Sequence, residues 1–507
     1  MTENTVATNA AAPAAASTAT QPAPSAAQPE AETAAAPAAT AVSFETQADV
    51  AAHNKRMRAY YQTGTTRPVE HRKAALLKLR AYLKQHEGEI LEALHADLGK
   101  SPFEAFTSEL GLVFDEISFC LKHLDAWTRP KVVPTPVVHF PSVSTVRPDP
   151  LGVVLVLSPW NYPVNLALVP LVDAIAAGNC VAVKPSRTSK HANTVLFDMI
   201  NALFDPSFVV AFPSSDDMND WLLAEPWDKI FFTGSPRVGR IVMEAAAKHL
   251  TPLVLELGGK SPCIVDESAN VRRAAERIAW GKGLNSAQTC VAPDYFLVHE
   301  SVEEEFVARL GQCFHQYYGA NILESPDWPR MINQKHYDAV MATIADRTPG
   351  TSIAWGGHGD PDTLKIEPTC IRGVTLADAS MQQENFGPVV PVLTYRTLDE
   401  AFAVIRQIPT PLAAYVFADD RAVQKRVVQE LPFGGGCVND VVIHVASNRL
   451  GFGGLGNSGM GAYHGKRGFD CFTHYKSVVQ KSTLVELPLR TPPFSACKLK
   501  LAKLFMR

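Results

Sequence analysis

Five short apolar runs between residues 152 and 257 constrain the fold more than any other feature of the chain. They read "GVVLVLS", "CVAVKPS", "FVVAFPS", "KIFFTGS" and "TPLVLELGG", and helix-compatible segments separate them. Continuous apolar runs joined by helices are typical of a parallel sheet that is covered on both faces. We therefore predict a doubly wound α/β domain, in which ligands bind at loops beyond the carboxyl ends of the strands.

The loops at those strand ends are polar or rich in glycine. They span residues 158–163, 184–187, 233–239 and 256–260. Their position alone predicts a dinucleotide-type site. A second region, about 258–450, repeats the alternation less regularly in "PCIVDES", "DYFLVHES", "PVVPVLTYR" and "LAAYVFAD". We expect a second α/β domain there, with the active site in the cleft between the two domains.

The segment before residue 130 has a helical pattern instead. A helix is expected to begin near Pro68 and to place Ala75, Leu76, Leu79 and Leu83 on one face. The following "VVHFPSVSTVRPDPLG" combines alternation with several prolines, which favours edge strands or a hairpin arm.

Composition excludes several classes of protein. A chain of 507 residues is too long for one core, and its formal charge of −4 gives no reason to expect nucleic acid as a partner. No apolar run is long enough to span a membrane. The nine cysteines include no Cys-x-x-Cys pair and are odd in number, so we expect a reducing, cytoplasmic setting and no metal site.

The two ends of the chain differ in composition. Residues 1–42 consist mostly of Ala, Pro, Thr and Ser, and no Lys or Arg precedes Lys55. This segment is expected to be a disordered tail without a targeting signal. The end, "KLKLAKLFMR", is basic and apolar; a docked or frayed terminus is favoured over a weak contact with a membrane surface.

Single motifs decide little. "GSPRVG" lacks the order of a Rossmann fingerprint, and "LGGKS" would need glycine where Val254 stands to be a P-loop. No serine-hydrolase elbow occurs, and no histidine partner for a hydrolytic cysteine is identifiable.

In combination, the motifs "SPWNYP", "VKPS", "FFTGSPRVG", "LELGGKSP", "LNSAQTC", "ENFGPV" and "GFGGLGNSGMGAYHGK" follow one another along nearly all of the chain after the tail. This order resembles the aldehyde dehydrogenase superfamily, and it is most similar to the class 3, or fatty aldehyde dehydrogenase-like, branch. The resemblance implies NAD(P)-dependent oxidation of a medium- or long-chain aliphatic, or an aromatic, aldehyde to the carboxylic acid.

The resemblance also implies roles for particular residues. Cys290 matches the nucleophile that forms a thiohemiacetal and then a thioester, Glu256 the general base for hydrolysis, and Asn161 the side chain that stabilises the oxyanion. Taken alone, Asn161 reads as a turn residue, and Glu256 as a strand-end carboxylate paired with Lys260. The residues at the positions of the family's NAD or NADP site are Trp160, Lys184, Arg187, Gly234, Ser235, Val238, Gly239, Glu384 and Phe386, of which Arg187 departs from the usual residue.

Three positions depart from the family's pattern. Ala287 and Gly451 stand where glycine and proline are usual, and a methyl group at residue 287 would crowd the loop if positive φ were needed. Arg187 replaces a glutamate that disfavours a 2′-phosphate, so we expect NADP to be tolerated; the alternative is a solvent-facing side chain.

The expected organisation follows the family. It comprises the tail (1–42), the helical part of the cofactor domain (43–130), an oligomerisation arm (131–150), the NAD(P)-binding domain (151–256), the catalytic domain (257–450) and a C-terminal return to the cofactor domain and arm (451–507). Relatives of this branch are usually homodimers. Two rival functions remain open: an enzyme that transfers the acyl group to coenzyme A, and a catalytically silent binding protein.

Overall fold

The five apolar runs of residues 152–257 form five strands of a six-stranded sheet, and the sixth strand comes from residues 459–460. In the computed structural model, which describes residues 43–506, its order is β17-β7-β6-β3-β4-β5, and every pairing is parallel except that of β17 with β7. The predicted tail, 1–42, lies outside the described residues. The strands are β3 (Val153–Leu157), β4 (Cys180–Lys184), β5 (Val209–Ala211), β6 (Lys229–Gly234), β7 (Leu253–Leu257) and β17 (Gly459–Met460). The doubly wound α/β fold class is confirmed.

The chain reverses its direction of winding between β3 and β6. From β3 it runs outward through β4 to β5, then returns to place β6 on the other side of β3. Such a reversal leaves a crevice at the carboxyl ends of the two strands, where doubly wound proteins bind ligands. The connecting helices are α6 (Asn165–Ala177), α7 (Lys190–Leu203), α8 (Met218–Ala224) and α9 (Pro236–Ala247).

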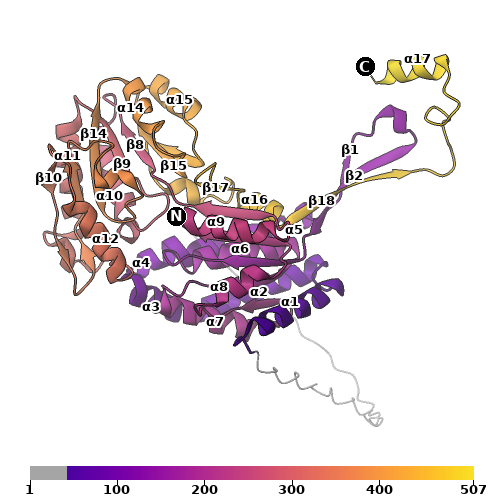
Figure 1. The fold of residues 1–507 in the computed structure, drawn as a ribbon, viewed down its shortest axis with the longest axis horizontal. Coiled ribbons are helices and arrows are strands. Elements are labelled where there is room, and N and C mark those ends of the chain that lie inside the picture. The colour runs from indigo at the N-terminus through magenta and orange to yellow at the C-terminus, as the bar shows by residue number, and fades with distance from the viewer. Residues whose placement is uncertain (1–42, 507) are drawn as a thin grey trace, which may run out of the picture. The chain divides into compact units, whose positions relative to one another are not determined.

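The N-terminal helices pack on this sheet and on one another (Figure 1). They are α1 (Gln47–Gln62), α2 (Val69–Gln85), α3 (Glu87–Leu98), α4 (Pro102–Ala105) and α5 (Gly111–Trp127), with a π-helical turn η1 (Phe106–Leu110) between the last two. The helix predicted after Pro68 is confirmed, since Pro68 caps α2 and Ala75, Leu76, Leu79 and Leu83 are all buried.

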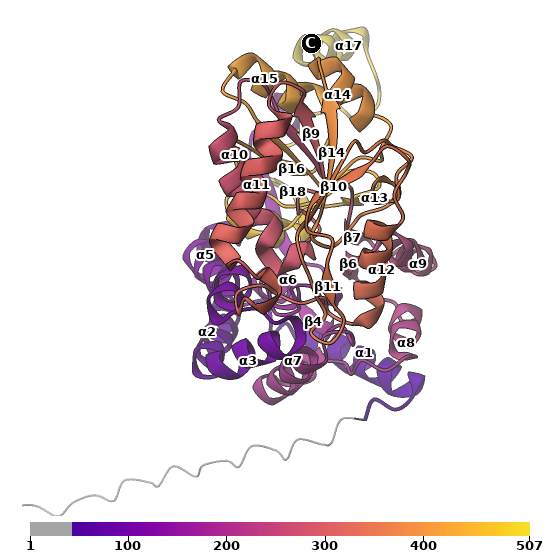
Figure 2. The same cartoon turned by 90° about the vertical axis from the view of Figure 1, so that its left-hand side faces the viewer.

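Residues 262–438 form a second, seven-stranded sheet with the order β10-β13-β14-β9-β8-β15-β16. All of its pairings are parallel except that of β10 with β13. Its strands are β8 (Pro262–Val265), β9 (Tyr295–His299), β10 (Ser352–Trp355), β13 (Thr369–Arg372), β14 (Val389–Tyr395), β15 (Ala413–Phe417) and β16 (Gly435–Val438). Helices α10 (Val271–Gly283) and α11 (Glu303–Tyr318) lie side by side against it (Figure 2).

A third, antiparallel sheet has the order β1-β2-β18 and contains the proline-rich segment expected to be an arm. Its strands are β1 (Lys131–Val133), β2 (Ser142–Pro150) and β18 (Thr473–Lys481). The longest pairing in this sheet is between β2 and β18, from Pro150 opposite Thr473 to Ser142 opposite Lys481. It joins the proline-rich segment to a strand from the C-terminal part of the chain.

The C-terminal residues form a short helix, α17 (Ala496–Phe505), whose side chains include no buried ones. Within residues 43–506, no helix is both long and apolar enough to cross a membrane.

Candidate active site

A cavity of about 910 Å³ lies at the carboxyl ends of β3, β6 and β7, where the reversal of winding predicts a ligand site. Residues of the loop before β14 close its other side. Eight of the residues singled out from the sequence line it: Trp160, Asn161, Gly234, Ser235, Glu256, Cys290, Glu384 and Phe386. Residues more than 200 positions apart in sequence therefore meet at one site.

Four others lie outside the cavity lining. Val238 donates its backbone N–H to the Ser235 side chain, and Gly239 packs on Leu257, where a Cβ would approach Cδ2 to 2.7 Å. Lys184 is buried at the end of β4, and burial lowers the pKa of its ammonium to about 8.

Arg187 is exposed and forms an ion pair with Asp216, which follows β5. Its guanidinium thus already has an anionic partner on the neighbouring loop, a pairing that the sequence did not suggest.

Cys290 follows α10 and the one-turn helix η3 (Leu284–Ala287). Residues 285–287 all have positive φ, of 51°, 50° and 58°, although none of them is glycine. Left-handed backbone costs a non-glycine residue roughly 1 kcal/mol or more. The concern about Ala287 therefore has a structural basis: this position does adopt the conformation that glycine prefers.

The Cys290 side chain is deep in the protein and only partly open to the cavity. Burial raises the pKa of its thiol well above the ordinary value, and the charges of Glu384 and Glu256 raise it further. Its own backbone N–H and that of Val291 act in the opposite direction. Burial and these negative charges therefore favour the neutral thiol over the thiolate.

Glu256 is the most unusual side chain of the cavity. It is 2% exposed, in a strand of otherwise apolar residues, and burial raises the pKa of its carboxyl well above the usual value. Neither carboxyl oxygen has a hydrogen-bond partner within residues 43–506. A buried carboxyl without a partner is costly, which points to a use other than stability.

The alternative pairing of Glu256 with Lys260 does not occur. Lys260 forms a buried ion pair with Asp294 and also donates to the backbone oxygens of Ser380 and Gln383, at 2.8 and 2.9 Å. This ammonium group is saturated by partners that belong to the opposite wall of the cavity.

Asn161 lies on the loop that follows β3, with 4% of its surface exposed. Its side-chain Nδ2 donates to the Gln288 backbone oxygen at 3.0 Å, two residues before Cys290. Since an amide nitrogen carries two hydrogens, one remains to be donated to a ligand.

Glu384 and Phe386 come from the loop between α13 (Ala379–Gln382) and β14. Burial and the Asp294 charge raise the pKa of Glu384 to about 8. A Cβ on Gly258 would come within 2.1 Å of Glu384 Oε2, so the carboxyl occupies space that only glycine leaves free. The Phe386 ring contacts the Trp160 ring edge to face, at 5.4 Å between centroids.

Ser235 caps the N-terminus of α9, accepting a hydrogen bond from Val238 N–H. The N-terminus of α9 faces the cavity, and Gly234 and Arg240 line the cavity beside it. The partial positive charge of a helix N-terminus and a nearby guanidinium favour a phosphate group.

Several lining residues were given no role of their own from the sequence, among them Thr233, Lys260, His336 and Asn457. Thr233, Lys260 and Asn457 lie within motifs already quoted, and Thr233 and Lys260 also belong to strand-end loops predicted to form the site. His336 packs its ring against Trp160 at 4.7 Å from an otherwise unremarked helix, α12 (Gln334–Ala345), and no local signal would have found it.

The fold and this cavity define a dehydrogenase-like architecture, and the sequence profile described as the aldehyde dehydrogenase family matches residues 25–478. The chain belongs to the aldehyde dehydrogenase family.

It is 45% identical to the 4,4'-diaponeurosporen-aldehyde dehydrogenase of Staphylococcus aureus (strain NCTC 8325 / PS 47), over 89% of this chain and 97% of that protein. It is 41% identical to aldehyde dehydrogenase family 3 member H1 of Arabidopsis thaliana, over 88% and 93%. The predicted similarity to the class 3 branch is confirmed.

Solved structures agree with this assignment. The substrate-bound state of Staphylococcus aureus AldH matches with a TM-score of 0.88 and 44% identity, over 90% of this chain and 99% of that one. A variant of the P. syringae indole-3-acetaldehyde dehydrogenase AldA in complex with NAD+ and IAA matches with a TM-score of 0.79 and 26% identity, over 86% and 89%.

Proposed function

We propose that this enzyme oxidises a medium- or long-chain aliphatic, or an aromatic, aldehyde to its carboxylic acid with NAD or NADP. The observation that carries the proposal is the convergence of Cys290, Glu256 and Asn161 on one cavity whose other wall is built from glycine turns and a helix N-terminus. These residues supply a nucleophile, a base and an oxyanion donor, which are the three groups that oxidation through a thioester needs.

The cavity fits a nicotinamide dinucleotide. The N-terminus of α9 and Arg240 suit a diphosphate, and Glu384 suits ribose hydroxyls. The buried Thr233 Oγ1 has no hydrogen-bond partner among the described residues, which is consistent with a polar ligand beside it. We propose Lys184 and Arg187 for the adenosine end of the site, and Trp160 and Phe386 for the nicotinamide end. When bound, the oxidised cofactor supplies a positive charge and accepts the hydride.

In the first half of the reaction, the Cys290 thiol gives up its proton to solvent in the cavity, which the positive charge of a bound cofactor would favour. The thiolate then adds to the aldehyde carbon and forms a thiohemiacetal. The charge on the former carbonyl oxygen is stabilised by the free hydrogen of Asn161 Nδ2 and the Cys290 backbone N–H. Loss of hydride from the carbon then restores a carbonyl, as a thioester.

In the second half, Glu256 removes a proton from a water molecule that attacks the thioester. The carbon–sulfur bond breaks, releasing the acid and the thiolate. Because burial raises the pKa of Glu256, the carboxyl is a stronger base than an exposed glutamate. This arrangement favours hydrolysis over transfer to coenzyme A, since transfer to a thiol does not need a base placed for water.

The enzyme test uses reduced-cofactor absorbance with hexanal, a long-chain aldehyde and benzaldehyde. The Cys290→Ala variant is expected to lose turnover, and normal turnover would refute the proposal. Glu256→Gln is expected to give a burst of reduced cofactor about equal to the enzyme and then to stall at the thioester. A steady rate equal to that of wild type would remove Glu256 from the role of base.

We further propose the division into domains set out from the sequence, with β1, β2 and β18 as the oligomerisation arm of a homodimer. Two observations support the role of the arm in a dimer: β2 pairs with β18, a segment distant in the sequence, and several valines of these strands are exposed.

A cytoplasmic location is supported by the cysteines, none of which forms a disulfide.

A further inference from the structure

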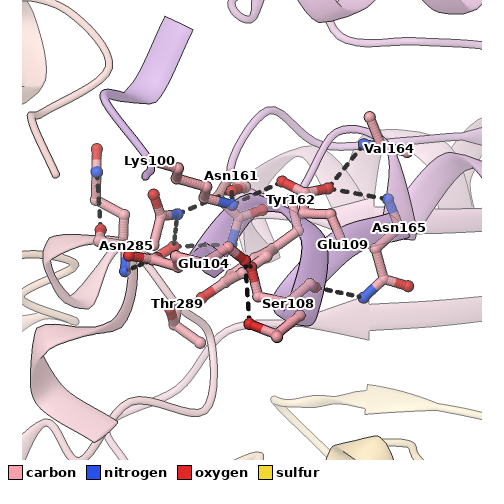
Figure 3. A network of polar contacts seen from close by, with 12 residues as sticks. Lys100, Glu104, Ser108, Glu109, Asn161, Tyr162, Val164, Asn165, Asn285 and Thr289 are labelled. Carbon is pink, nitrogen blue, oxygen red and sulfur yellow. Dashed lines mark hydrogen bonds and ion pairs between the residues drawn. The ribbon is translucent and has the colours of Figure 1, made fainter. Parts of the chain in front are cut away.

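Two buried carboxylates project from one short segment behind the candidate active site. Glu104 is on α4 and Glu109 on η1, and their side chains reach different loops of the reaction centre (Figure 3). Neither residue lines the cavity, and neither was singled out from the sequence.

Glu109 holds the loop that carries Asn161. One of its oxygens pairs with the fully buried Lys100 ammonium at 2.6 Å. The other accepts the backbone N–H groups of Val164 and Asn165, both at 3.0 Å. Lys100 in turn donates to the Asn161 backbone oxygen at 3.3 Å, so both ends of the loop are tied to the same ion pair.

Glu104 holds the loop that leads to Cys290. Its carboxyl oxygen accepts the backbone N–H of Asn285 at 2.7 Å, at the first of the three left-handed residues. Burial raises the pKa of Glu104 to about 7, against the effect of Lys100 and of this hydrogen bond. Asn285 Nδ2 then donates to the Asn161 backbone oxygen at 2.8 Å, which joins the two loops directly.

The π-helical turn explains how one segment serves both loops. In an α-helix, positions five apart point roughly 140° away from each other around the axis. In η1 the hydrogen bonds close over five residues, as from Gly111 N–H to Phe106 O, which brings positions five apart closer to one face. Glu104 and Glu109 are five apart, and such turns often occur at functional sites.

We propose that Glu104 and Glu109 are positioning residues that fix the Asn161 amide and the Cys290 backbone N–H relative to each other, and so set the geometry of the oxyanion site. The inference rests on the proposed function, which makes those two groups the oxyanion donors. Donors of this kind act only when held in place, and a displacement of about 1 Å can lower a rate 100-fold.

The Glu104 contact is tested with two variants of similar size. Glu104→Met removes the acceptor for Asn285 N–H and is expected to lower kcat about 100-fold while KM for the aldehyde changes less than about three-fold. Glu104→Gln retains a carbonyl acceptor and is expected to keep kcat within about five-fold of wild type. A kcat near wild type for the methionine variant, or equal losses in both variants, would contradict the proposal.

The Glu109 contact needs double variants, because removing one partner would leave a buried charge. Lys100→Met with Glu109→Gln retains an acceptor for Val164 and Asn165, whereas Lys100→Met with Glu109→Met does not. The second is expected to have a kcat about ten-fold below that of the first, with both folded. Indistinguishable rates would exclude Glu109.

Controls separate positioning from general disruption. Thr107→Ala changes an exposed hydroxyl on the same segment and should leave kcat unchanged. The rate at which iodoacetamide alkylates Cys290 should be the same in Glu104→Met as in wild type, since alkylation needs no oxyanion donor. If the methionine variant does not fold, hydrogen exchange of wild type decides: the Asn285 amide must exchange slowly, and exchange within seconds would refute the contact.

Cys290→Ala is measured in parallel. If it retained turnover, the proposed function would fail whatever Glu104 does. If it were inactive while Glu104→Met turned over normally, the positioning role alone would be wrong.

Discussion

At the scale of one residue, the burial of the Glu256 carboxyl affects the stability of the folded protein as well as the proposed reaction. Burial raises the pKa of this carboxyl in the folded chain, so between the unfolded and folded values the folded state binds more protons than the unfolded state. This carboxyl therefore contributes its full stabilisation at pH values below its pKa in the unfolded chain. The stabilisation is lost as the pH rises through its pKa in the folded chain.

We therefore expect Glu256→Gln to be more stable than wild type at alkaline pH. The melting temperature of wild type should fall more between pH 5 and pH 9 than that of the variant, by roughly 1–3 °C. Scanning calorimetry across this range checks the difference, with the exposed Glu244→Gln as the control. Parallel curves for Glu256→Gln and wild type would show that the carboxyl is not stabilised in its protonated form.

Ala287 is a second residue whose backbone gives a sharp prediction. Its φ of 58° costs about 1–2 kcal/mol for a residue with a Cβ, against roughly 0.5–1 kcal/mol for the greater entropy of unfolded glycine. Ala287→Gly should therefore raise the free energy of unfolding by up to about 1 kcal/mol.

Chemical denaturation measures this, with Ala287→Val expected to be destabilising. Ala292→Gly, at a buried position outside the left-handed run, is the matched control and should lose stability. A loss of stability in Ala287→Gly would mean that the methyl group packs better than its backbone conformation suggests.

At the scale of elements, the loops after β4 and β5 determine whether a guanidinium is free to bind the 2′-phosphate of NADP. Arg187 follows β4 and pairs with Asp216, which follows β5. A phosphate would have to compete with that carboxylate for the guanidinium. Asp216→Asn should therefore raise kcat/KM for NADP about ten-fold and leave the value for NAD unchanged, since a charge-assisted hydrogen bond contributes about 1.5–3 kcal/mol.

Steady-state kinetics with both cofactors provides the measurement, and Asp217→Asn, the neighbouring acid, is the control. An unchanged ratio would place Arg187 outside the cofactor site and favour the alternative of a solvent-facing side chain.

At the scale of the whole molecule, the sheet β1-β2-β18 and the loop between β1 and β2 expose apolar side chains to solvent, which does not stabilise a monomer. Val479 is 58% exposed on β18, and Val132 and Phe140 are 68% and 62% exposed nearby. In a homodimer these side chains would be covered. We expect Val479→Asp to shift the protein from dimer to monomer in sedimentation velocity, while Val428→Asp, at a valine 53% exposed on α15 (Arg421–Glu430), does not. A wild-type monomer would refute the arm's role.

The sequence predicted what depends on local pattern. Apolar runs predicted strands β3 to β7 of the first sheet and β8, β9, β14 and β15 of the second. Strands β10, β13, β16 and β17, which complete the two sheets, were not predicted. The ion pair of Lys100 with Glu109 and its hold on residues 161–165 depend on tertiary contacts, which no spacing in the sequence encodes. The partner of Arg187 was missed for the same reason. For Ala287, the sequence predicted crowding by the methyl group only if the residue had a positive φ, and it could not predict the φ itself.

The pairing of β17 with β7 has a consequence for how the protein is made. Gly459 lies opposite Glu256, so the strand that carries the carboxyl is closed by a segment synthesised about 200 residues later. At the usual speed of translation, roughly 10–40 s pass between the appearance of the two on the ribosome. During that interval one edge of β7 has no strand beside it, and any chain that terminates early keeps it exposed. Premature termination near the end of the reading frame should therefore yield aggregation-prone chains rather than merely shortened enzymes.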